Sequence, residues 1–169
     1  MTSFTPARLV TTSEPSETRW SGRQLAEFVT DAAADARRWA RLVGFDEHER
    51  FALKLDEDDE RDLWLLTWLP GQHTGWHDHG GSNGAFAVAR GALHERRYVA
   101  GHGRREIRLG PRASRIVPDP VLHDVRNQGP ASAISLHAYS PPLRTMTYFD
   151  ERLDVSQIAD IQAPGARAR

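Results

Sequence analysis

The sequence contains no cysteine, a single lysine and no long apolar run. The lack of cysteine excludes disulfides, zinc–thiolate sites and cysteine nucleophiles, so a transition metal must be bound by His, Asp or Glu. No stretch approaches the ~18 apolar residues that a transmembrane helix needs. The net charge of −1 gives no basic surface for nucleic acid. We therefore expect a cytoplasmic protein without nucleic-acid or membrane partners, as a monomer or weak homo-oligomer.

The 169 residues are enough for one domain with its own core. Residues 1–20 are rich in Thr, Ser and Pro, which predicts a flexible arm rather than a signal peptide. Residues 21–169 form the single domain. Within it, helical spacing of apolar residues predicts a helical segment over 21–44, either one helix or two broken near 30–35. We expect a barrel over 45–150 and a tail over 151–169.

After Gly44 the apolar spacing changes from helical to alternating, as in half-buried strands. A first strand covers Arg50–Leu55, and an apolar run, Leu63–Leu69, ends at a Pro-Gly pair. Turn residues separate further short strands: Ala85–Ala89, Leu93–Val99, Glu106–Leu109, Arg115–Val117, His123–Arg126 and Ile134–Tyr139. Many short strands with regular turns predict an all-β sandwich or barrel.

Three histidines are candidate metal ligands. His77 and His79 flank one aspartate, and side chains two residues apart in an extended segment point to the same face. His123 offers a third imidazole, a ligand that suits Fe, Zn, Cu and Ni. A lone His-x-His pair is more often a surface coincidence than a metal site, so the surrounding residues must decide.

The surrounding glycines fit a known pattern. Gly71 stands six residues before His77 and Gly91 twelve after His79, which resembles the first cupin motif, G-x5-H-x-H-x3/4-E-x6-G. The segment around His123, residues 118–127, resembles the second motif, P-x-G-x2-H-x3-N. The resemblance implies a mainly all-β fold, a cupin-type jelly-roll β-barrel with an N-terminal helical segment.

The match departs from the cupin pattern in two places. Pro120 replaces the glycine of the second motif. The glutamate of the first motif is missing, with Asn83 and Gly84 at its possible positions. The ligand set would then be three neutral histidines, which resembles the thiol dioxygenase branch of the cupins.

A second block supports that branch. Ser135-Leu-His137-Ala-Tyr139-Ser-Pro-Pro is similar to the S-x-H-x-Y-S-P-P block of the cysteine dioxygenase type I family. The resemblance implies Fe(2+) on His77, His79 and His123, with Tyr139 beside the iron, His137 orienting Tyr139 and Ser135 orienting His137. It also implies a cis Ser140–Pro141 bond. The partners implied are a small thiol such as cysteine and O2, which would yield a sulfinate with both oxygen atoms. A Cys–Tyr crosslink cannot form without cysteine, as in bacterial members; Gly84 falls at the cysteine position.

The substrate clamp is less defined. The family binds the substrate carboxylate with an arginine, often in a Tyr-x-Arg on an early strand. In our preferred alignment to this motif, Ala52 stands at the tyrosine position and Lys54 at the arginine position. A different gap in the alignment places Arg50 at the arginine position. Residues 50 and 54 share parity, hence one strand face, and exposure of both cations to solvent is an equal alternative. A lysine ammonium group binds a carboxylate as a single point charge, whereas an arginine guanidinium can donate two parallel hydrogen bonds to it.

Three functions remain open from the sequence. The main hypothesis is an Fe(2+) thiol dioxygenase acting on cysteine or a related carboxylated thiol. The alternatives are a cupin metalloenzyme with a non-thiol substrate and a non-catalytic small-molecule-binding cupin. The intact histidines with Ser135, His137 and Tyr139 favour the first, whereas the altered segment around Lys54 keeps the others open.

Overall fold

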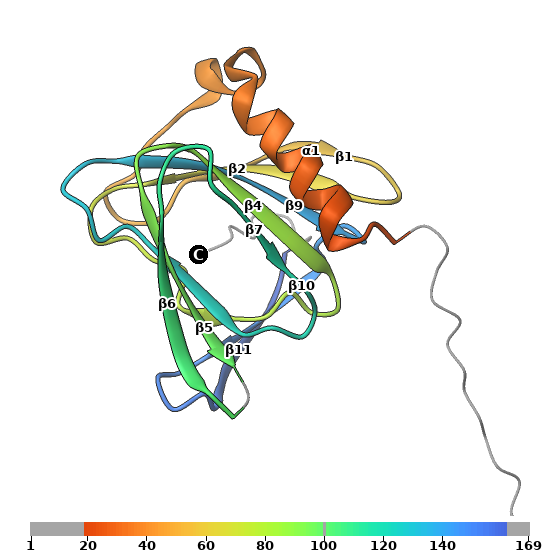
Figure 1. The fold of residues 1–169 in the computed structure, drawn as a ribbon, viewed down its shortest axis with the longest axis vertical. Coiled ribbons are helices and arrows are strands. Elements are labelled where there is room, and N and C mark those ends of the chain that lie inside the picture. Colours follow the sequence, from red (N-terminus) through yellow and green to blue (C-terminus); the bar gives the residue numbers. More distant parts are fainter. Residues whose placement is uncertain (1–18, 100, 162–169) are drawn as a thin grey trace, which may run out of the picture.

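Two antiparallel β-sheets enclose one interior in the computed structural model, which describes residues 19–99 and 101–161 (Figure 1). The helices are α1 (Gly22–Ala34), η1 (Ala36–Arg38) and η2 (Ala40–Leu42). The strands are β1 (Ala52–Glu57), β2 (Asp62–Trp68), β3 (Trp76–His77), β4 (Asn83–Arg90), β5 (Leu93–Val99), β6 (Gly103–Leu109), β7 (Ser114–Val117), β8 (His123–Arg126), β9 (Ala133–Ser140), β10 (Thr145–Phe149) and β11 (Val155–Asp160).

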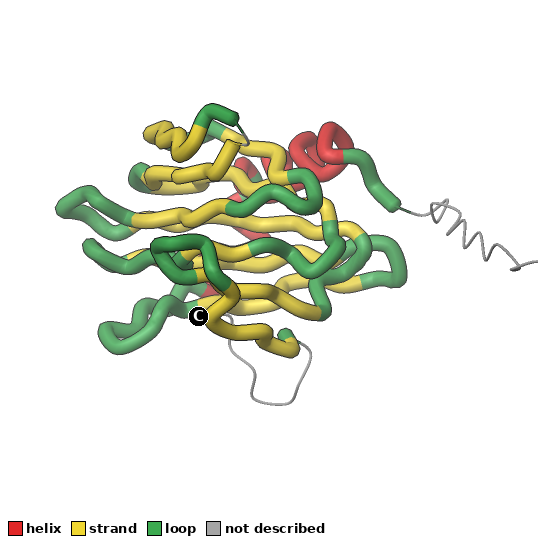
Figure 2. The backbone as a smooth tube through the Cα atoms, turned by 90° about the horizontal axis from the view of Figure 1, so that it is seen from below, coloured by secondary structure: helices red, strands yellow, loops and turns green. Residues whose placement is uncertain are grey.

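The strand order is that of a jelly roll. One sheet runs β1-β2-β9-β4-β7 and the other β11-β10-β3-β8-β5-β6. From below, the strands lie side by side across the molecule with α1 at one side (Figure 2). The structure confirms the predicted all-β jelly-roll barrel with an N-terminal helical segment.

Strand β2 is buried on both faces, which explains its continuous apolar run. Trp64, Leu66 and Trp68 point into the barrel and join the cluster that contains the inner residues of β4, β5 and β9. Leu63 and Leu65 point outward and pack in a second cluster with α1. The period of two therefore places even-numbered β2 residues toward the interior.

Helix α1 covers the outer face of the first sheet, where it packs on β4, β9 and β7. Ser21 and Gln24 form a reciprocal capping box at its start. Leu25, Val29 and Ala32 are its buried residues. The helix ends before Asp35, which lies at the end of the predicted break, and two short 3-10 turns follow. The broken form of the predicted helical segment is thus the one observed.

The second sheet extends beyond the predicted end of the barrel. Strand β11 pairs antiparallel with β10, so the expected boundary at residue 150 lies inside this hairpin. Val155 and Ile158 of β11 are largely exposed, so no alternating pattern signals the strand in the sequence. The Ser140–Pro141 bond is cis, as predicted. The expected arm lies almost wholly in residues 1–18, outside the described residues, and no described helix is long and apolar enough to cross a membrane.

Candidate metal centre

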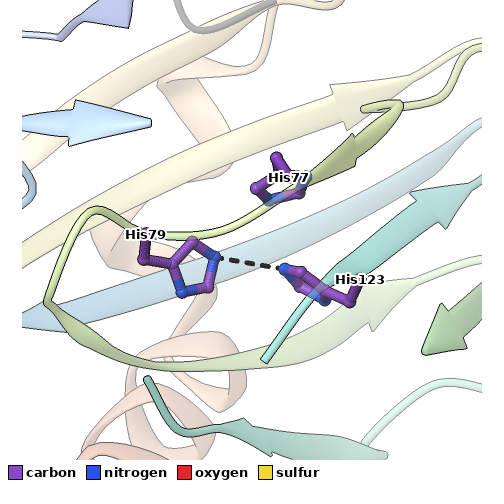
Figure 3. Close-up of side chains that lie close together, drawn as sticks. All are labelled: His77, His79 and His123. Carbon is purple, nitrogen blue, oxygen red and sulfur yellow. Dashed lines mark hydrogen bonds between the residues drawn. The ribbon is translucent and has the colours of Figure 1, made fainter. Parts of the chain in front are cut away.

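The three predicted histidines converge inside the barrel. His77 ends β3, His123 begins β8, and the two are cross-strand partners, while His79 lies in the loop after β3 (Figure 3). One ligand nitrogen from each lies within 4.8 Å of the others. Two nitrogens held about 2.1 Å from one ion at right angles lie about 3.0 Å apart. The Nε2 atoms of His79 and His123 are 3.1 Å apart, so their spacing fits a shared metal ion.

In two of the three candidate ligands, His77 and His123, the Nδ1 atom already makes a hydrogen bond. Nδ1 of His77 lies 3.0 Å from the Gly75 carbonyl, which can only accept a hydrogen bond. Nδ1 of His123 lies 3.0 Å from the Glu95 carboxylate. Each Nδ1 therefore donates its proton, and each Nε2 keeps its lone pair for a metal.

Burial keeps the imidazoles of His77 and His79 neutral. Desolvation lowers the pKa of His77 and of His79 well below the ordinary value, and the neighbouring His123 lowers both further. Neutral imidazole is the form that binds metals. Among the described residues, this is the one cluster of His, Asp or Glu found suited to a metal ion.

A narrow cavity of about 20 Å³ adjoins the histidines, with room for about one water molecule. Its wall includes His77, His123, His137 and Tyr139, and apolar side chains from β2, β8 and β10. Arg50 also lines it, stacked on Trp68 with its guanidinium carbon 4.8 Å from the ring centroid. The cavity is thus small, largely apolar, and carries one cation.

The two candidate clamp residues occupy different places. Arg50 precedes β1, is 5% exposed and donates to the His73 carbonyl at 3.2 Å. Burial lowers its pKa to about 10, so it stays charged at neutral pH. Lys54 lies within β1, pairs with Glu57 at 2.5 Å and does not line the cavity. Both cations stack on inward-facing tryptophans of β2, Arg50 on Trp68 and Lys54 on Trp64, so they share a face but lie at different points along it.

Ser135 and His137 form the first half of the predicted triad. The Trp68 indole N–H donates to Ser135 Oγ at 2.9 Å, and Ser135 Oγ lies 2.8 Å from His137 Nε2. Burial holds the pKa of His137 well below its ordinary value, so the ring is neutral, and its Nε2 shares a hydrogen bond with the Ser135 hydroxyl. Within the described residues no hydrogen bond joins His137 to Tyr139; their ring centroids lie 6.5 Å apart.

Tyr139 on β9 lies beside His79, one of the three candidate metal ligands. Its ring centroid is 4.8 Å from that of His79, and burial raises its pKa, so the phenol keeps its proton. Gly84 pairs with Tyr139 in the sheet. A Cβ at Gly84 would lie 2.9 Å from the His79 ring and 3.3 Å from the Tyr139 ring. The lack of a side chain at this position is what lets the two rings meet.

We expect Gly84→Ala to weaken metal binding about 10- to 100-fold, because the new methyl group displaces the His79 ring. The measurement is the dissociation constant for Co(II) under anaerobic conditions. Gly110→Ala is the matched control, since a Cβ there meets nothing within 4 Å. Equal Co(II) affinity in Gly84→Ala and wild type would contradict the prediction that the methyl group displaces a metal-binding His79 ring.

Asp62 is a fully buried carboxyl opposite Tyr139 on β2. It accepts from the Leu143 backbone N–H at 3.0 Å, while burial raises its pKa to about 6 from 3.8. A carboxyl with a higher pKa in the folded protein binds its proton more tightly there than in the unfolded chain. Protonated Asp62 therefore stabilises the fold at low pH, and that stabilisation is lost as pH rises from about 4 to 6.

Asp62→Asn should therefore remove that pH dependence and raise the free energy of unfolding at about pH 7.5 by roughly 1–2 kcal/mol. Urea unfolding of the metal-free protein at about pH 4.5 and 7.5 measures both effects. Asp59→Asn, in the exposed hairpin, is the control. A variant that is less stable at the higher pH would mean that Asp62 is ionised and paired in the folded state.

Sequence reasoning missed one residue of this centre, Glu95. Glu95 lies on β5, where its cross-strand partner is Val125 of β8. Its carboxylate reaches diagonally to His123, two residues before Val125. Glu95 has the same parity as the buried Leu93, so a carboxylate on the inward face of a strand was a signal the sequence offered.

The family comparison agrees with the site. The model for "Cysteine dioxygenase type I" matches residues 22–152. Cysteine dioxygenase type 1 of Danio rerio is 26% identical over 125 residues, 68% of this chain and 62% of that protein. The Homo sapiens protein of the same name is 28% identical over 130 residues, 70% of this chain and 64% of that protein. The match thus spans less than two thirds of the length of these relatives.

Solved structures share the fold. A protein from Thermus thermophilus superposes with a TM-score of 0.55 at 24% identity, over 61% of this chain and 93% of that one. A cupin superfamily protein from Desulfitobacterium hafniense gives a TM-score of 0.52 at 16% identity, over 61% of this chain and 87% of the other. These likenesses establish a cupin barrel.

Proposed function

Because this chain belongs to the cysteine dioxygenase type I family, we propose that it is a non-haem Fe(2+) thiol dioxygenase that converts a small carboxylated thiol, such as cysteine, to its sulfinate. The observation that carries the proposal is the convergence of three buried imidazoles beside a small cavity that Arg50 also lines. A ferrous ion on the three Nε2 atoms would supply open coordination positions for a thiolate and for O2.

The overall reaction balances without a further reductant. The S–H bond breaks, both atoms of O2 become bonded to sulfur, and sulfur supplies all of the electrons that O2 accepts. The released proton must leave a site in which the imidazoles of His77, His79 and His137 are neutral and buried. The protein's task is therefore to bind the thiol, orient it and exclude water.

Arg50 is the proposed carboxylate clamp. Its planar guanidinium suits a bidentate carboxylate, and in a buried site such a charge-assisted pair is strong. Tyr139 keeps its phenolic proton and supplies a hydrogen-bond donor beside the ligand His79. Ser135 fixes the orientation of His137. The small volume of the cavity favours a substrate of few heavy atoms.

The test is oxygen uptake by the anaerobically Fe(2+)-loaded protein against cysteine, 3-mercaptopropionate, cysteamine, homocysteine and bulkier thiols. We expect uptake with a small carboxylated thiol and much less with cysteamine, which lacks the carboxylate. Iron bound at the histidines without uptake for any thiol would contradict the proposal and favour a non-thiol substrate.

A further inference from the structure

Glu95 is a buried carboxylate that the proposed reaction does not use. It is 0% exposed, although it lies on β5, near the edge of its sheet. Its Oε1 lies 3.0 Å from His123 Nδ1 and 2.8 Å from Arg97 Nη2, and its Oε2 accepts from Arg115 Nε at 2.9 Å. Both carboxylate oxygens are therefore held, and one of them faces a metal ligand.

The carboxylate is ionised in the folded protein. Two guanidinium groups contact this carboxylate, that of Arg97 at Oε1 and that of Arg115 at Oε2, and their positive charges favour its ionised form. An acceptor with no proton fixes the proton of His123 on Nδ1 and leaves Nε2 as the ligand atom. The matching contact of His77 is to a neutral backbone carbonyl, so His123 alone of these two has an anion behind it.

We propose that Glu95 is a positioning residue of the metal site, which fixes the ligating form of His123 and strengthens its bond to the metal through the imidazole. The inference rests on the metal-binding part of the proposed function. It gives this chain a carboxylate behind the ligands, where the cupin motif places a glutamate directly on the metal and this sequence has Asn83 or Gly84. The metal then keeps an open coordination position and still lies near a negative charge.

The arginines explain why the carboxylate is stable there. A buried anion held only by a neutral imidazole would be costly, whereas Arg97 and Arg115 supply charge-assisted hydrogen bonds from β5 and β7. They leave Oε1 shared between His123 and Arg97, so Glu95 cannot turn away from the ligand without losing an ion pair.

The test is the Co(II) dissociation constant of Glu95→Gln, measured by competition under anaerobic conditions. Glutamine keeps the shape and removes the charge, and we expect affinity to fall about 10- to 100-fold. Glu106→Gln is the matched control: Glu106 makes the same carboxylate–imidazole contact, 3.0 Å to His94 Nδ1, on the exposed strand β6. Unchanged Co(II) affinity in a folded Glu95→Gln would overturn the proposal.

A measurement on the wild type keeps the proposal testable if the variant does not fold. In the Zn(II)-loaded protein, proton–nitrogen NMR of the histidine rings should show a His123 Nδ1–H that exchanges slowly and is shifted downfield. A His123 that binds Zn(II) through Nδ1, or whose Nδ1 proton exchanges freely, would contradict the proposal. These readouts need no thiol turnover, so they are independent of whether the chain oxidises thiols.

Discussion

His123→Ala should abolish both metal binding and thiol-dependent oxygen uptake. It removes one of three ligands and leaves the Glu95 carboxylate without its imidazole partner. Loss of a bound metal removes several kcal/mol of stabilisation of reacting charge, which corresponds to a fall in rate of about a thousand-fold or more. Iron content by metal analysis and oxygen uptake by electrode measure the two effects.

His48→Ala is the matched control, because His48 is exposed and lies before β1, away from the three ligands. It should keep the iron content and uptake of the wild type. Full iron content in His123→Ala would mean that the metal lies elsewhere, and retained uptake without iron would remove the metal from the reaction.

Arg50→Gln should raise KM for a carboxylated thiol about 30- to 100-fold with little change in iron content. The variant removes a buried charge-assisted contact worth about 2–3 kcal/mol. The effect falls mainly on KM because Arg50 lies on the cavity wall rather than among the metal ligands. Steady-state oxygen uptake against thiol concentration separates KM from kcat.

Lys54→Gln is the control for the loss of one cation, and its KM should change less than about twofold. Lys54 is bonded to Glu57 outside the cavity wall. A large rise in KM for Lys54→Gln with none for Arg50→Gln would assign the clamp to Lys54. An unchanged KM in both variants would reject the carboxylate clamp altogether.

The barrel was predictable because its signals are local. Alternation in β1 and the apolar run of β2 follow from burial on one or both faces, and turns separate the later strands. Strands β3, β10 and β11 were not among the predicted strands: β3 has only two residues, β10 is a short strand of five, and β11 exposes most of its side chains. Such strands owe their pairing to neighbours far away in the chain.

The residues of the metal centre also fall into those that a local sequence pattern predicts and those that it does not. His77 and His79 are neighbours in sequence, and the motif around His123 has its own spacing, so the ligand set could be predicted. Alternation along β5 could place Glu95 on the inward face, but its contact with His123 joins residues 28 apart on two strands, and no local pattern encodes that pairing. The glutamate ligand of the cupin motif is missing from this sequence, but another carboxylate, Glu95, contacts the Nδ1 atom of the candidate ligand His123.

The alternation of side chains along a strand could not decide whether Arg50 or Lys54 faces the substrate, since it places both residues on the same face. The structure separates them through tertiary contacts: Arg50 stacks on Trp68 and bonds the His73 carbonyl. Lys54 instead meets Glu57, three residues later in the same strand. Where a long cationic side chain ends depends on such partners more than on the position of its Cα.

The most direct test of the central claim is the origin of the product's oxygen. The Fe(2+)-loaded protein would be given its best thiol under isotope-labelled O2 in unlabelled water, and the product examined by mass spectrometry. A thiol dioxygenase at His77, His79 and His123 yields a sulfinate in which both oxygen atoms carry the label. A product with one labelled atom or none, or a disulfide alone, would contradict the account.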